Sequence, residues 1–167
     1  MKNRFRIAAA LIVAYLCGPV LAQTETAVQA APSSKMKLQL SPYTHHFTQD
    51  DEHKDVLMVG LEREYPNGKL DGAVFFTNSF GQHSVYLYPW GQVYHSIWGV
   101  KPLSFKWTAG LLYGYKEPYE NKVPLNHNGF SPGAIIALEY EFQSGWSAQV
   151  DMLGTAGLMF QLNMPFK

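Results

Sequence analysis

Few reactive side chains are available in this chain. Its 167 residues include a single cysteine, Cys17, within an apolar N-terminal stretch. That stretch has the three parts of a secretory signal: a basic start, an apolar run over residues 7–16, and a small residue, Ala22, at the expected cleavage site. We expect residues 1–22 to be removed, which leaves a mature chain without thiol chemistry, disulfides or cysteine ligands.

Long apolar runs and an excess of one charge are also missing. Residues 7–16 are too few to cross a bilayer as a helix, and no second such run follows. The chain has 13 Lys and Arg against 13 Asp and Glu, a balance that gives no support for a nucleic-acid partner. It also lacks a phosphate-binding loop and a Gly-x-Ser-x-Gly motif, which gives no support for a soluble hydrolase, and we expect no cofactor.

What the chain does have is an alternation of large apolar with small or polar side chains, which is the period of a β-strand. Residues 23–34 are small and polar and predict a flexible periplasmic lead-in to one domain over residues 35–167. In that domain the alternation predicts strands at residues 35–47, 55–65, 69–79, 83–98, 103–115, 132–142, 146–154 and 157–166.

The last of these segments is the most informative. Its large apolar side chains are Leu158, Phe160, Leu162, Met164 and Phe166. Alternation of this kind, ending on an aromatic residue behind a secretory signal, is typical of the closing strand of an outer-membrane barrel. We therefore expect an all-β fold, an eight-stranded antiparallel up-and-down transmembrane β-barrel, in the outer membrane of a Gram-negative bacterium.

Alternation alone does not say which face lies inside, because a soluble lipocalin-like barrel has the same period with its apolar face turned inward. The small and polar face carries Glu62, Glu64, Lys106, Glu139, Glu141, Gln149 and Asp151. Such charges are less costly as a mutually paired polar interior than in an apolar lumen. Their placement favours the membrane barrel.

Strand order predicts one group of reactive side chains. His45 and His46 end the first strand, and Asn78 and Ser79 end the third, on the same rim as the acidic residues 50–52. Imidazole, hydroxyl and carboxylate are the groups that activate an oxygen nucleophile. The alternative is a solvated rim of ordinary loop residues. A metal site is not expected, because adjacent histidines in a strand point to opposite faces.

Several short stretches, spread in order over most of the mature chain, resemble the lipid A palmitoyltransferase family. They are Thr44-His45-His46-Phe47, Asn67-Gly68, Asp71-Gly72 to Phe76, Asn78-Ser79, Val123-Pro124-Leu125, Pro132 ahead of Tyr140, and Gly154-Thr155 to Gly157. Members of that family are eight-stranded outer-membrane barrels that move a palmitoyl chain from a phospholipid onto lipid A. The resemblance implies a membrane-embedded monomer whose partners are phospholipid and lipid A.

The resemblance also implies roles for the rim residues. His46 would be the base, Ser79 the activated hydroxyl and Asn78 a polarising group, above a lumen that measures the acyl chain. The chain departs from the family where Asn78 replaces an Asp, where residues 23–34 replace a helix, and at Lys167. The charged inner face also predicts a lumen too polar for a long acyl chain along its whole depth. A second hypothesis is therefore a non-enzymatic barrel with a structural role, or one that binds an amphiphile or partner through residues 116–131.

Overall fold

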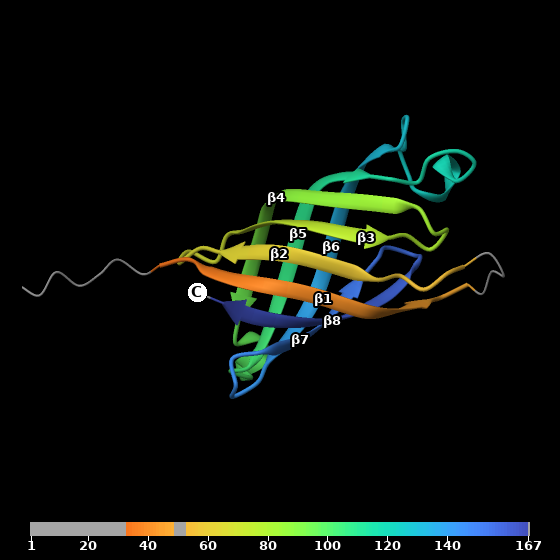
Figure 1. The fold of residues 1–167 in the computed structure, drawn as a ribbon. Helices are drawn as coiled ribbons and strands as arrows, with labels where there is room; N and C mark the ends of the chain where they lie inside the picture. Colours follow the sequence, from red (N-terminus) through yellow and green to blue (C-terminus); the bar gives the residue numbers. More distant parts are fainter. Residues whose placement is uncertain (1–32, 49–52, 167) are drawn as a thin grey trace, which may run out of the picture. The chain divides into compact units, whose positions relative to one another are not determined.

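A computed structural model describes residues 33–48 and 53–166. The expected signal peptide, nearly all of the lead-in and Lys167 lie outside these residues. The described chain forms a closed antiparallel barrel of eight strands in which each strand pairs with its neighbours in sequence and β8 pairs with β1 (Figure 1). The predicted all-β, eight-stranded antiparallel up-and-down barrel is confirmed.

The strands lie close to the predicted segments. They are β1 (Lys35–His46), β2 (Met58–Glu64), β3 (Leu70–Thr77), β4 (His83–His95), β5 (Leu103–Tyr113), β6 (Phe130–Glu141), β7 (Ser147–Met152) and β8 (Gly157–Phe166). Two 3-10 turns, η1 (Ile97–Gly99) and η2 (Glu120–Lys122), lie in connections. Among the described residues, no helix has the length and apolar character needed to cross a membrane.

One boundary differs in a way that matters for the site. The predicted fifth strand extends to residue 115, whereas β5 ends at Tyr113. Gly114 has a φ of 150° and Tyr115 a φ of 50°, so the backbone leaves the extended conformation there. Tyr115, predicted to continue the outward apolar face of the strand, instead lines the cavity inside the barrel.

The barrel is polar inside and apolar outside. Lys106 and Glu62 are each 1% exposed, whereas Leu61 is 47% and Trp90 65% exposed. A soluble barrel with an apolar lumen would show the opposite distribution. The predicted polar interior is therefore observed.

Ion pairs fill one half of the lumen. This is the half at the end of the barrel where β1 begins and β8 ends. Lys106 Nζ donates to Glu62 Oε1 at 2.5 Å and to Gln149 Oε1 at 2.9 Å. Lys37 Nζ lies 2.9 Å from Glu139 Oε1, and Lys106 Nζ lies 3.4 Å from Glu139 Oε2. These side chains come from β1, β2, β5, β6 and β7. The network therefore links strands that are not neighbours in the sheet.

The opposite half of the lumen is apolar. Met58, Val74, Tyr86, Tyr88 and Met159 form a buried cluster there. The partly buried side chains of Phe76, Leu112, Ile135 and Leu153 pack against it. The sequence pattern records the face of each residue and not its height in the barrel, so it did not show that the inward charges gather in one half of the lumen.

We expect Lys106→Met to lower the free energy of unfolding by about 3–5 kcal/mol, because it leaves buried Glu62 without its cation. The measurement is urea unfolding of the barrel in detergent. Arg63→Met is the matched control, since the Arg63 and Asp71 side chains, 2.7 Å apart, are 45% and 29% exposed. For Arg63→Met, the free energy of unfolding is expected to fall by less than about 1 kcal/mol. Equal losses for the two variants would contradict this prediction.

Candidate functional site

A bulge in β1 selects which histidine enters the barrel. Leu40 pairs with Leu162 and Tyr43 with Phe160, so three residue steps in β1 oppose two in β8. The extra residue reverses the inward and outward positions beyond it. As a result, His46 lines the cavity inside the barrel.

The same bulge turns His45 outward. It is exposed, and its ring lies edge-on to Phe47 at a centroid distance of 6.2 Å. The sequence predicted both histidines as candidates, and the structure brings only His46 to the site.

His46 and Ser79 meet at the rim of the barrel. His46 Nε2 lies 2.6 Å from Ser79 Oγ, although the two residues are 33 positions apart in the chain. Ser79 follows β3 and is 9% exposed. A histidine in hydrogen-bond contact with a shielded hydroxyl is the arrangement of a base and an oxygen nucleophile.

Asn78 builds the turn that carries Ser79. Its Oδ1 accepts hydrogen bonds from the backbone N–H groups of Phe80 and Gln82, both at 3.0 Å. Its own backbone N–H donates to Gln82 O at 2.8 Å. Asn78 is fully buried and fixes the position of the neighbouring serine. Its proposed role as a polarising group stays a prediction.

Aromatic contacts join three connections at this rim. The rings of His46 and His53 lie 4.2 Å apart, and His53 lies edge-on to Phe80 at 5.5 Å. Phe80 in turn stacks on Tyr119 at 4.3 Å. Over residues 33–48 and 53–166, no group of three or more His, Cys, Asp or Glu side chains is placed to hold a metal ion.

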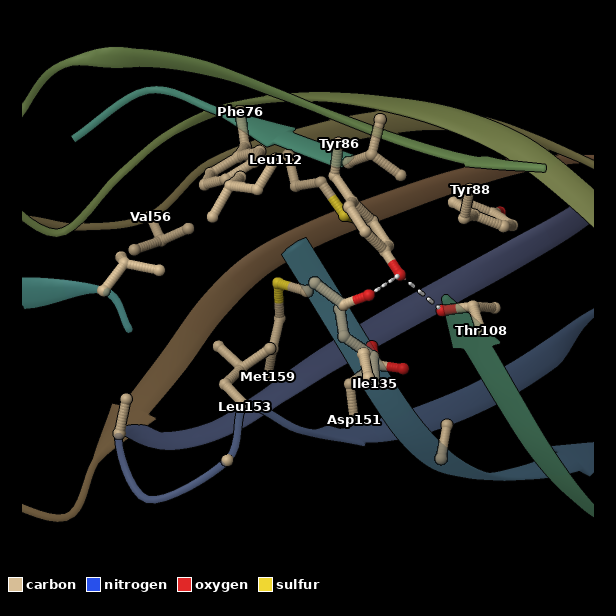
Figure 2. A pocket seen from close by; sticks show the side chains of 18 of the residues that line it. Val56, Phe76, Tyr86, Tyr88, Thr108, Leu112, Ile135, Asp151, Leu153 and Met159 are labelled. Atoms are coloured by element: carbon tan, nitrogen blue, oxygen red, sulfur yellow. Dashed lines mark hydrogen bonds between the residues drawn. The ribbon is translucent and has the colours of Figure 1, made fainter. Parts of the chain in front are cut away.

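Below the rim lies a cavity of about 440 Å³. His46, Ser79 and Tyr115 line its mouth. The apolar half of the lumen forms its walls, with Phe76, Leu112 and Met159 among the side chains drawn in Figure 2. Figure 2 shows Val56, Phe76 and Leu112 grouped away from Thr108 and Tyr88.

The cavity closes on polar groups. The Tyr86 hydroxyl lies 3.2 Å from Thr108 Oγ1, and Glu62, Lys106 and Asp151 line the deep end. The cavity is therefore a one-ended apolar pocket with a charged floor.

Sequence reasoning missed Tyr115, and it named the long loop over residues 116–131 only as a binding segment, not as part of the wall of this pocket. Val123, Pro124 and Leu125 line the pocket together with Tyr115. The one signal in the sequence is Gly114, because glycine tolerates backbone conformations that end a strand.

Comparison with known proteins adds no relatives: no protein-family model and no curated protein matches this chain. The resemblance to the lipid A palmitoyltransferase family stays a prediction that rests on the residues quoted above.

Asn78→Ala is expected to lower the free energy of unfolding by about 1–3 kcal/mol, because one buried and one partly buried N–H group lose their acceptor. Asn78→Asp is expected to keep the stability, since a carboxylate oxygen accepts the same two hydrogen bonds. Urea unfolding of both variants measures their free energies of unfolding against that of the wild type. A stable Asn78→Ala barrel would show that the turn does not depend on this side chain.

Proposed function

We propose that this chain is an outer-membrane barrel that transfers an acyl chain from a phospholipid to lipid A. The observation that carries the proposal is the 2.6 Å contact between His46 Nε2 and Ser79 Oγ at the mouth of the apolar pocket. An acyl chain in this pocket would present its ester carbonyl to Ser79. Each buried methylene would contribute about 0.8 kcal/mol to binding.

The outer surface supports a membrane location. Its exposed apolar side chains include Leu57, Val59, Leu61, Leu87, Leu111, Ile136 and Leu138. Exposed aromatic side chains gather at both ends of the barrel. At the end where β1 begins and β8 ends they are Tyr94, Trp98, Tyr140, Phe142, Trp146 and Phe166. At the opposite end they are Tyr43, Phe47, Phe75 and Phe130. Membrane barrels carry such an apolar band between two aromatic girdles. The secretory signal at residues 1–22 fits export to that membrane.

The chemistry follows from the two side chains. Ser79 Oγ attacks the ester carbonyl carbon while its proton passes to His46 Nε2. The glycerol oxygen leaves and takes that proton, which yields a lysophospholipid and an acyl-serine. A hydroxyl of lipid A then attacks the acyl-serine as His46 accepts its proton. Ser79 finally recovers a proton from His46.

Ser79→Ala and His46→Ala are each expected to abolish acyl transfer, because they remove the nucleophile and the base. The measurement is the mass spectrum of lipid A from Gram-negative cells that produce each variant. Ser144→Ala and His83→Ala are matched controls, since Ser144 lies in an exposed turn and His83 packs on outward Phe75. Heat-modifiable migration in gels shows that each barrel is folded. Identical lipid A masses with and without the wild-type protein would refute the proposed activity.

The deep end of the pocket is expected to limit acyl length. Ala137 lines the pocket, is 6% exposed and pairs in register with Lys106 and Asp151, so Ala137→Leu fills space at the charged floor. The transferred chain should become shorter by about two methylene groups, each worth about 0.8 kcal/mol of binding. Mass spectrometry of the modified lipid A measures this shift. Ala148→Leu, on the exposed face of β7, is the control and should leave the chain length unchanged.

The apolar pocket also favours the second hypothesis, a barrel that binds an amphiphile without catalysis. That hypothesis predicts that the wild-type barrel binds a fluorescent fatty-acyl probe but leaves lipid A unmodified.

A further inference from the structure

Tyr115 has a backbone conformation that tyrosine rarely adopts. Its φ is 50°, in the left-handed region, and it lies directly after Gly114, whose φ is also positive. For a bulky residue this conformation costs free energy and persists only where the surroundings fix it. Residues held in this way cluster at functional sites.

Hydrogen bonds fix the backbone on both sides of Tyr115. Asn126 Nδ2 donates to Tyr115 O at 2.9 Å. The next residue, Lys116, donates its N–H to Gln82 Oε1 at 2.8 Å and accepts from Gln82 Nε2 at 3.0 Å. Gln82 also closes the Asn78 turn that carries Ser79. Tyr115 and Ser79 are therefore held by one hydrogen-bonded unit.

The Tyr115 side chain lies at the same pocket mouth as the reacting group. It lines the pocket mouth with His46 and Ser79, and its ring lies 6.2 Å from that of Phe80, the residue after Ser79. Burial raises the pKa of the Tyr115 hydroxyl. The hydroxyl is therefore protonated at neutral pH and available as a donor.

The backbone N–H groups of the turn that follows Ser79 already donate hydrogen bonds within that turn. Acyl-transfer sites often stabilise the oxyanion with the N–H of the residue after the nucleophile. Here that residue is Phe80, whose N–H donates to Asn78 Oδ1 at 3.0 Å. Gly81 N–H donates to Asn78 O at 2.8 Å, and Gln82 N–H donates to Asn78 Oδ1. A side-chain donor next to Ser79 would take over this task.

We propose that Tyr115 is a further catalytic residue, whose hydroxyl donates a hydrogen bond to the oxyanion formed when Ser79 attacks an acyl ester. This inference rests on the proposed function. As the bond from Ser79 Oγ to the carbonyl carbon forms, the C=O π electrons move onto the carbonyl oxygen and the serine proton passes to His46 Nε2. Tyr115 keeps its own proton. When the intermediate collapses, the carbon–oxygen bond to glycerol breaks and that oxygen takes the proton from His46.

Tyr115→Phe tests this role, because it removes the hydroxyl and keeps the ring, which lies 6.2 Å from Phe80. With the purified barrel in detergent, dipalmitoylphosphatidylcholine as donor and lipid A as acceptor, kcat should fall about 10²–10³-fold. KM should change less than about twofold, since the hydrogen bond forms only with the oxyanion. Tyr113→Phe is the control, because its ring packs on exposed Phe130 at 4.5 Å, and it should match the wild type.

A second readout separates this inference from the proposed function. A fluorophosphonate reacts with an activated serine, losing fluoride as negative charge builds on the phosphoryl oxygen. Wild-type barrel should be labelled at Ser79, and Tyr115→Phe should be labelled about 10-fold or more slowly. Asn126→Ala, which frees the Tyr115 carbonyl, should slow labelling to a lesser degree.

The outcomes are distinct. Wild-type protein that is labelled at Ser79 but transfers no acyl chain would overturn the proposed function. In that case, slower labelling of Tyr115→Phe than of the wild type would still support the role of Tyr115. A folded Tyr115→Phe barrel with wild-type kcat or, where transfer is absent, wild-type labelling would overturn the inference. Absence of labelling at wild-type Ser79 together with absence of transfer would overturn both.

Discussion

The buried charge network around Lys106 is the constraint on which the rest of the interior depends. A closed barrel with an apolar outer face has to place its ionic side chains in the lumen, where each charge needs a partner. Lys106 is 1% exposed and contacts Glu62, Gln149 and Glu139, which come from three other strands. Because these contacts occupy one half of the lumen, the apolar cavity is confined to the other half and ends on a charged floor.

The reactive end of the barrel is shaped by irregular backbone. The bulge in β1 turns His46 inward, the Asn78 turn holds Ser79 beside it, and the left-handed backbone at Tyr115 brings a phenol to the same point. None of these features belongs to a regular strand. The regular hydrogen-bonded strands form a rigid scaffold. The bulge, the turn and the left-handed residue orient the side chains that could react.

Much of this architecture follows from the pattern of residues. Alternation predicted eight strands because a strand with one apolar face repeats every two residues. Strand parity then placed His46 and Ser79 on one rim, and they lie there in contact. The choice between His45 and His46 could not follow from parity, since one extra residue near Pro42 reverses the faces. Tyr115 was missed because apolar alternation continues past the end of the β5 ladder.

The sequence by itself determined the number of strands, the polar identity of the inner face and the rim on which the histidines and Ser79 lie. These are properties of residue order, and period-2 alternation carries them directly. Only the tertiary structure decided where the charges end and the apolar pocket begins, which histidine turns inward, and that Tyr115 lines the pocket mouth with Ser79. Those outcomes depend on register, bulges and contacts between residues far apart in the chain, which no local pattern encodes.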